Sequence, residues 1–311
     1  MNQQKLNNYT LFGSVHTAQI KTSDEVSDVQ DSVDGSINVM SSTKADGKTV
    51  TAVINPNKLV GDCFKFSEFQ TVVDTILAGA GIKNYQFTRA DMRFDSYDPS
   101  HYTTYAKLNR YLISALAVTY RVQNVYRTTD LFTDKQLSVA IKNDYFQCEN
   151  YNRAAKSEIT HNTKEPAQSR LEVRTVSRQW RIINEKPGSN MEKLRDDMVN
   201  TWFRRWDKAL ENLPLVHQRY NDALEQIYRE GKSSYPRKFR SLTDFLLQYE
   251  NCIFCKSQMI DLLSRFPDEV KNPKTRAENH KKKWGVEFFS QNDVKKAIAE
   301  VRRAALEFFD N

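Results

Sequence analysis

The sequence predicts an α+β protein, with an antiparallel sheet that has helices on one face and a C-terminal region made of helices. Two observations predict this class. Between residues 50 and 176, segments that alternate apolar and polar residues are interspersed with helix-like segments and a tight turn. After residues 186–188, Lys-Pro-Gly, only the helical spacing of three and four residues remains. This order of elements is typical of an α+β fold rather than of a parallel α/β sheet.

The length of 311 residues is close to the size at which a single hydrophobic core stops growing. We therefore expect one large domain or two domains of modest size. The change of pattern near residue 188 predicts a boundary there, between residues 1–188 and residues 189–311.

The first fifty residues are polar and carry weak signals. Residues 10–21 resemble a short strand, and residues 22–42 form an acidic, serine-rich stretch that we expect to be a loop. Residues 49–55 alternate as a strand does. This strand should end at residues 55–57, Asn-Pro-Asn, because a proline lacks the N–H that continues a ladder.

A helix should follow, with Ser67 as its N-cap and Gly79 and Gly81 as its stop. Its apolar residues recur at three and four, at Phe69, Val72, Val73, Ile76 and Leu77. A second helix should begin at residues 98–99, Asp-Pro, and run to about residue 118.

Residues 85–95 alternate strictly, which predicts a strand with two different faces. One face carries Ala90, Met92 and Phe94, and the other carries Arg89, Asp91, Arg93 and Asp95. Residues 169–176 repeat this pattern: Leu171 and Val173 should point inward, and Arg170, Glu172 and Arg174 outward. Between these strands, residues 137–142 and 145–151 flank Asn143-Asp144 and predict a hairpin.

The C-terminal region should begin with a capping box of Ser189 and Glu192. The apolar stripe that follows contains Met191, Leu194, Met198, Trp202 and Trp206. Further helices are expected at about 215–230, 242–264 and 291–309, and the last has its own apolar stripe. Such stripes can pack on the sheet or pair two subunits, and the pattern favours neither.

Several enzyme classes lack their sequence motifs here. None of the nine glycines falls in a P-loop, a dinucleotide-binding loop or a nucleophile elbow. No two of the five histidines lie within five residues of each other, which excludes zincin and paired-histidine metal motifs. The pair Cys252 and Cys255 lies in a segment of helical spacing without a second pair, so we interpret both as buried thiols.

The net charge of +7 and the pI near 9.0 favour a polyanionic partner. Two basic clusters stand out in the helical region: Lys232, Arg237, Lys238 and Arg240, and Lys271, Lys274, Arg276, Lys281, Lys282 and Lys283. They fit phosphate contacts and a plain solvated surface equally well. No stretch of about 18 apolar residues and no signal peptide is present, so we expect a cytoplasmic protein without a membrane partner.

The carboxylates on the charged strand faces suggest a metal site. Asp91 and Asp95 are about 13 Å apart along one strand, which is too far for direct ligation of one ion by both. One of them together with Glu172 is the more plausible pair. Ligand sets made only of oxygen suit Mg²⁺ or Mn²⁺. The neighbouring arginines, Arg89, Arg93, Arg170 and Arg174, would then bind the phosphate groups of a phosphodiester substrate.

Four blocks in order resemble the replication-initiation-factor family, the replication initiators of Gram-positive rolling-circle plasmids. QFTRADMRFD (86–95) resembles the family's FTRLDLAFD, and INPNKL (54–59) its FNPNKL. ENYNRAAKSE (149–158) resembles IYNKKQE, which contains the catalytic tyrosine, and SRLEVRTVSRQW (169–180) resembles WRVEIEL. Each block alone is weak, but their order and spacing over residues 50–180 are specific.

The resemblance implies that Tyr151 is the nucleophile that attacks one DNA strand. A 5′-phosphotyrosyl link would form, and the free 3′-OH would serve as a primer. It also implies a metal site of Asp91 and Glu172 with Asp95 nearby. The family's lysines after the tyrosine correspond to Arg153 and Ala154, with Lys156 further on, and we take Arg153 and Lys156 as the helper cations.

Arg174 stands where the family has a second glutamate. The implied core is ferredoxin-like, of the HUH type. Residues 1–188 would be the catalytic nicking domain and residues 189–311 a helical region for DNA recognition and dimerisation. The implied partners are the double-stranded origin, the single-stranded nick site, a second copy of the chain and a host helicase of the UvrD type.

The sequence therefore predicts a nicking and joining enzyme that starts rolling-circle replication at its origin. Three alternatives remain open, and the most general is a basic α+β protein that binds something other than DNA. A relaxase of a conjugative or integrative element would use the same chemistry, and neighbouring transfer genes would identify it. A DNA-binding regulator without cleavage is a different class, and the presence of Tyr151, Asp91 and Glu172 argues against it.

Overall fold

The structure is a computed structural model, and it describes residues 9–24, 26, 36–44, 47–61, 63, 65–122, 124–125, 139–154 and 167–310. Within these residues, eight strands form one sheet in the order β2-β3-β1-β4-β8-β7-β6-β5, and all neighbours are antiparallel. The strands are β1 (Phe12–Thr22), β2 (Ile37–Lys44), β3 (Gly47–Ile54), β4 (Gln86–Ser96), β5 (Asn124–Val125), β6 (Val139–Lys142), β7 (Phe146–Asn152) and β8 (Ser169–Thr175).

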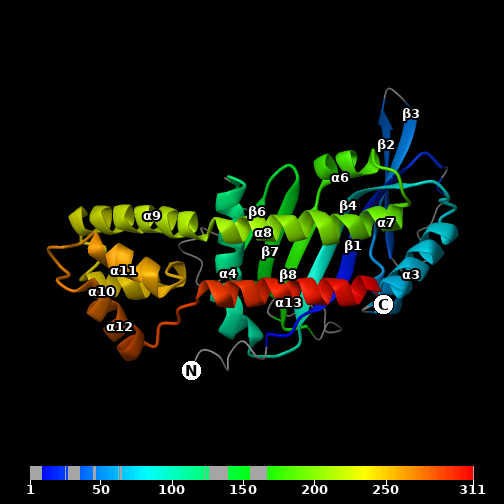
Figure 1. The fold of residues 1–311 in the computed structure, drawn as a ribbon. Helices are drawn as coiled ribbons and strands as arrows, with labels where there is room; N and C mark the ends of the chain where they lie inside the picture. The colour runs from blue at the N-terminus through cyan, green and yellow to red at the C-terminus, as the bar shows by residue number, and fades with distance from the viewer. Residues whose placement is uncertain are drawn as a thin grey trace.

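Some helices lie between the strands in the sequence, and the others follow the last strand (Figure 1). The α-helices are α2 (Asn57–Val60), α3 (Phe66–Gly79), α4 (His101–Thr119), α6 (Ser177–Asn184), α7 (Asn190–Asp196), α8 (Phe203–Glu211), α9 (Leu213–Ser233), α10 (Leu242–Gln248), α11 (Lys256–Ser264), α12 (Pro273–Trp284) and α13 (Gln291–Asp310). A π-helical segment, η2 (Asp197–Trp202), joins α7 to α8, and a 3₁₀ turn, η3 (Glu250–Cys252), follows α10. The prediction of an α+β fold is confirmed.

Helices α8 and α13 cross the sheet side by side, as Figure 1 shows. They pack on the face that carries Met92, Phe94, Leu171 and Val173, which we call the core face. The closest approach is at Gly13 of β1, where an added Cβ would lie 2.5 Å from the carbonyl oxygen of Ala304. Any larger side chain there would push α13 off the sheet.

The apolar stripes of the C-terminal helices pack inside the molecule. Trp202 lies edge-on to Phe146 of β7, with ring centroids 5.4 Å apart. Phe308 of α13 is buried in the same cluster as Val15 and Phe94 of the sheet. Of the two uses that the sequence left open, packing on the sheet is therefore the observed one. The division near residue 188 stays a prediction.

Most of the predicted elements are confirmed. The strands expected at 10–21, 49–55, 85–95 and 169–176 occur as β1, β3, β4 and β8, and the hairpin occurs as β6 and β7. Asn143 closes that hairpin, because its Oδ1 accepts hydrogen bonds from the N–H groups of Tyr145 and Phe146, both at 2.9 Å. The capping box of Ser189 and Glu192 is also present.

Three predictions about elements were wrong. Residues 37–44 are not loop but strand β2, which pairs with β3 as a hairpin; residues 27–35 lie outside the described residues. The helix expected at 242–264 is divided into α10, η3 and α11 by extended backbone at Ile253 and Cys255. Between them, the carbonyl of Phe254 accepts from the N–H of Phe289 at 2.7 Å. Helix α3 begins at Phe66 with Lys65 as its N-cap, so Ser67 lies inside it.

Helices α6 and α12 were missed because each buries few apolar residues. Helix α6 buries Trp180 and Ile183, and α12 buries Ala277 and His280. The start of α12 nevertheless has local signals, since Asn272 accepts from the N–H of Thr275 and Pro273 occupies the first turn. Among the described residues, no helix combines the length and apolar character needed to cross a membrane.

The segment η2 contains a buried acid whose titration should affect stability. Asp197 accepts a hydrogen bond of 2.5 Å from the hydroxyl of Thr175, which in turn accepts one from the Trp202 indole at 2.9 Å. Burial raises the pKa of Asp197 from 3.8 to about 6. The folded protein therefore holds this proton more tightly than the unfolded chain, and stability is lost as the pH rises from about 4 through about 6.

Asp197→Asn should remove this pH dependence. A shift of two pKa units corresponds to at most about 3 kcal/mol of unfolding free energy. Urea unfolding of both proteins at intervals between pH 4.5 and 8 would measure it. We expect the wild-type protein to lose stability relative to the variant as the pH rises; a constant difference across this range would contradict the assignment.

Candidate functional site

The strands β4, β8 and β7 bring the predicted site residues onto one face of the sheet. Residues that are directly opposite in an antiparallel pair point to the same side. The opposed pairs are Asp91 with Arg174, Arg93 with Glu172 and Asp95 with Arg170 between β4 and β8, and Glu149 with Glu172 and Tyr151 with Arg170 between β8 and β7. We call this the polar face, and the predicted orientation of its side chains is confirmed.

The polar face is buried, although the sequence suggested an outward, solvated face. Asp91, Asp95 and Glu172 are 1%, 1% and 6% exposed, and Tyr151 is 5% exposed. Charged groups can be held away from water only when hydrogen bonds and opposite charges compensate their lost hydration. The ion pairs of this face are therefore far more strongly constrained than those of an open surface.

Asp95 is held by two arginines from different strands. Its two oxygens accept from Nε and Nη2 of Arg170 at 2.6 and 2.8 Å. The Nε of Arg93 lies 3.4 Å from Asp95, and Arg93 Nη2 donates to Asn57 of α2 at 3.0 Å. Such forked pairing orients the Arg170 guanidinium against Asp95. Its role as a metal ligand stays a prediction.

Arg174 lies between Asp91 and Glu172. Its Nε donates to Asp91 Oδ1 and its Nη2 to Glu172 Oε1, each at 2.7 Å, and Nη1 donates to Gln147 at 3.0 Å. Burial alone would lower the pKa of Arg174, but the charges of Asp91 and Glu172 outweigh this effect and raise the pKa above its ordinary value. Asp91 also accepts from Thr17 at 2.6 Å and from Arg89.

The Asp91–Glu172 pair is the one that the sequence assigned to a divalent cation. In this structure the Arg174 guanidinium takes the bridging position between the two carboxylates. Within the described parts of the chain, no three histidine, cysteine or acidic side chains gather as a metal site would require. The arrangement does not fit an ion shared by Asp91 and Glu172, and binding one would require Arg174 to leave. The use of Mg²⁺ or Mn²⁺ stays a prediction.

The side chains of Tyr151 and Glu172 are joined by a hydrogen bond. Its hydroxyl donates to Glu172 Oε2 at 3.2 Å. Burial, and then the charge of Glu172, raise the pKa of Tyr151 above its ordinary value, while Arg170 and Arg153 act in the opposite direction. The phenol is therefore neutral at physiological pH, with a carboxylate placed to accept its proton.

Two helper cations were predicted beside Tyr151. Arg153 follows β7, is 7% exposed, and has its backbone N–H on the carbonyl of Gln168 at 2.9 Å. Its charge acts on the Tyr151 phenol. Lys156 lies in residues 155–166, outside the described residues.

The other predicted DNA contacts lie elsewhere in the molecule. Helices α9–α12 form a group on the far side of α4 from the sheet, as Figure 1 shows. This group carries Arg237, Lys238 and Arg240, which are exposed, and Lys232, which is paired with Glu269 at 2.5 Å. It also carries Lys281, Lys282 and Lys283, in the last turn of α12. The structure therefore does not bring these clusters together with Tyr151.

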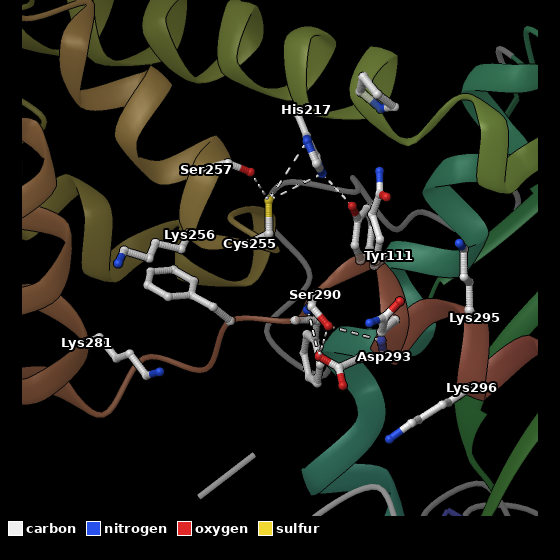
Figure 2. Close-up of a pocket in the computed structure, with 15 residues that line it drawn as sticks. Tyr111, His217, Cys255, Lys256, Ser257, Lys281, Ser290, Asp293, Lys295 and Lys296 are labelled. Carbon is white, nitrogen blue, oxygen red and sulfur yellow. Dashed lines mark hydrogen bonds between the residues drawn. The ribbon is translucent and has the colours of Figure 1, made fainter. Parts of the chain in front are cut away.

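A cleft of about 1000 Å³ separates this group from α13 and was not predicted. Figure 2 shows Cys255, His217 and Tyr111 at its base. The Cys255 sulfur lies 3.5 Å from His217 Nε2, and the Tyr111 hydroxyl contacts the same nitrogen. Cys252 and Cys255 are buried, as expected, with 1% and 7% exposure. No sequence signal joins residues from three distant segments, so reasoning from the sequence could not find this cluster.

The polar face has more complete chemistry than this cleft. It combines a neutral phenol, an acceptor for its proton and arginines fixed by buried acids. Thr17, Asn57 and Gln147 complete these pairings and were not predicted as site residues. Only Asn57 had a signal, in the INPNKL block.

No protein-family model, curated protein or solved structure matches this chain. The chemistry of the polar face is therefore the basis for a functional assignment.

Proposed function

We propose that this protein nicks and rejoins one strand of DNA through a covalent link to Tyr151, and that it starts rolling-circle replication at an origin. One observation carries the proposal: the Tyr151 hydroxyl donates a hydrogen bond to Glu172 on the polar face, which is lined with arginines. A phenol needs a base to become a nucleophile, and a phosphodiester needs cations where charge develops. Both are present within three adjacent strands.

In the proposed reaction, Glu172 accepts the phenolic proton as Tyr151 Oη attacks the phosphorus. The Oη–P bond forms and the bond from phosphorus to the 3′-oxygen breaks. The departing 3′-oxygen takes up a proton and becomes the free 3′-OH. The 5′-phosphotyrosine conserves the phosphodiester, so the reverse sequence rejoins the ends without ATP.

The arginines of the polar face differ in their proposed roles. Arg170 is directly opposite Tyr151 and is oriented by Asp95. We assign to Arg170 and Arg153 the stabilisation of the charge that builds on the phosphoryl oxygens. Arg174 instead orients Glu172, to which it donates at 2.7 Å.

The test is direct detection of the adduct. Purified protein is incubated with supercoiled DNA that carries its own gene and flanking sequence, in parallel with Mg²⁺, Mn²⁺ or a chelator. After digestion, mass spectrometry should find a nucleotide-linked peptide that contains Tyr151. Cleavage that persists in the chelator would refute the divalent-ion requirement. Tight binding to this DNA without a nick or adduct would favour the non-catalytic regulator.

The predicted homodimer and the UvrD-type helicase remain proposals that follow from the resemblance. Size measurement by light scattering, with and without origin DNA, would test the first. A pull-down with purified helicase on nicked DNA would test the second.

The lysines at the end of α12 should contribute to duplex binding. Lys282 and Lys283 are exposed, and Lys281 lines the rim of the cleft in Figure 2. Replacing all three with glutamine should lower affinity and reduce the slope of log K against log salt by about 2.7, since each phosphate contact contributes about 0.9.

The matched control for this triple variant replaces Lys186, Arg195 and Arg204, which are exposed on α7, α8 and the turn before them. It removes the same charge from the helical layer that covers the core face. If both variants lose the same amount of salt slope, only the net charge of the protein matters for binding. If the slope of the Lys281, Lys282 and Lys283 variant is unchanged, these lysines are a solvated surface that does not contact DNA.

A further inference from the structure

A second cavity, of about 640 Å³, lies at one end of the polar face. It is formed by the start of β4, the end of β6, the turn between β6 and β7, and the first turn of α6. Four cationic side chains line it, Arg89, Lys142, Arg178 and Arg181, against one acid, Asp144. The sequence analysis assigned a role only to Arg89 among these residues.

Two of the arginines are held in place by neighbours. Arg178 donates to Asp144 at 3.0 Å, and its guanidinium lies 4.9 Å from the centre of the Tyr145 ring. Arg89 is bound to Asp91. Arg181 is exposed, and no carboxylate in the described part of the chain pairs with it. The cavity therefore combines two arginines that are oriented by acids with the exposed Arg181, a set of donors that suits a phosphate more than a diffuse counterion.

The backbone of α6 adds to this preference. Ser177, the first residue of α6, lines the cavity, and the N-cap residue Val176 has no side-chain acceptor for the first N–H groups of the helix. Free N–H groups at the start of a helix favour a negative charge. This contribution supplements the arginines.

The cavity is joined to Tyr151 by continuous contacts. Arg89 binds Asp91, Asp91 binds Arg174, Arg174 binds Glu172, and Glu172 accepts from Tyr151. Asp95 of β4 and Tyr151 of β7 lie in the same row across the sheet, because both are opposite Arg170. Arg89 precedes Asp95 by six residues, which is about 20 Å along the strand. A distance of about 20 Å corresponds to about six nucleotides of a DNA strand with a rise of about 3.4 Å per nucleotide, and to fewer nucleotides of an extended strand.

We propose that this cavity binds backbone phosphates of the single DNA strand that Tyr151 attacks, no more than about six nucleotides from the attacked bond. The placement relative to Tyr151 rests on the proposed function, whereas the affinity for single-stranded DNA does not. The two parts are therefore tested separately.

The binding part uses a labelled thymidine oligonucleotide of about 12 nucleotides, which requires no knowledge of the origin. Arg178→Ala/Arg181→Ala is compared with Arg195→Ala/Arg204→Ala, which removes two exposed charges from the helical layer on the core face. We expect weaker binding only in the first variant, with a salt slope lower by about 1.4, because each single-strand phosphate contact contributes about 0.7. Equal affinities in the two variants, or no binding by the wild-type protein, would overturn the site. Thermal unfolding checks that both variants fold.

The placement part uses single strands that contain the mapped nick site and are shortened stepwise on either side. Wild-type adduct formation at low DNA concentration should fall when one arm becomes shorter than about six nucleotides. Adduct formation by the Arg178→Ala/Arg181→Ala variant should not depend on the length of that arm. If the variant responds to arm length as the wild type does, the placement is wrong. If no adduct forms but the two variants still differ in thymidine binding, the proposed function fails and the phosphate site stands.

Discussion

Tyr151→Phe is expected to abolish the covalent adduct while leaving DNA binding unchanged. The substitution removes only Oη, which donates to Glu172 Oε2 at 3.2 Å, and keeps the buried ring in place. Loss of a covalent nucleophile lowers turnover by about a thousandfold or more. Nicking of supercoiled DNA and mass spectrometry of the adduct would both measure this loss.

The matched control is Tyr145→Phe on the same hairpin. Tyr145 precedes β7, is half-buried and lies under Arg178. It should retain the adduct. An adduct that persists in Tyr151→Phe would show that another residue is the nucleophile, and loss of activity in both variants would point to damage of the hairpin. The lost hydrogen bond should cost about 1 kcal/mol of stability, so the variant should fold.

Glu172→Gln should produce the second largest effect. If Glu172 removes the phenolic proton, single-turnover cleavage should fall by about 10²- to 10⁴-fold, because the amide cannot act as the base. The pKa of Tyr151 is raised by burial, so little phenolate is present near neutral pH. The rate of the variant should therefore keep rising with pH across the whole range in which the protein stays folded, because the phenolate must form without a base, whereas the wild-type rate should depend less on pH.

This pH profile separates two roles for Glu172. A metal ligand would, on substitution, increase the Mn²⁺ concentration needed for half-maximal cleavage. A base would change the pH profile and leave the metal titration in place. Glu149→Gln is the control, since Glu149 is directly opposite Glu172 on the same face and carries the same charge. An unchanged rate in Glu172→Gln would exclude both roles.

Local sequence patterns predicted the strand faces correctly. The alternation in β4 and β8 assigns each side chain to a face, because successive side chains of a strand point to opposite sides. Asp91 and Glu172 consequently appeared as candidates before any pairing was known, whereas Tyr151 was a candidate only through the resemblance to the replication-initiation-factor family. The same reasoning predicted the helices with broad apolar stripes and missed α6 and α12, which bury few apolar residues.

Contacts across strands could not be predicted in the same way. Arg174 and Asp91 are 83 residues apart in the chain, and Tyr151 and Glu172 are 21 apart. Their contact depends on the register of β4, β8 and β7, and a shift of one residue would turn each side chain to the other face. The acids alone suggest a metal site, because the position of Arg174 between them depends on strand pairing that the sequence does not specify.

The amino-acid sequence alone was sufficient for the α+β class and the orientation of the strand residues, because both depend on spacing along the chain. Tertiary structure decided that the polar face is buried, that Arg174 bridges Asp91 and Glu172, and that Glu172 accepts from Tyr151. It also created the cavity lined by Arg89, Lys142, Arg178 and Arg181. The reason is physical: burial and charge pairing depend on distances between segments, which only the packed sheet and its helices set.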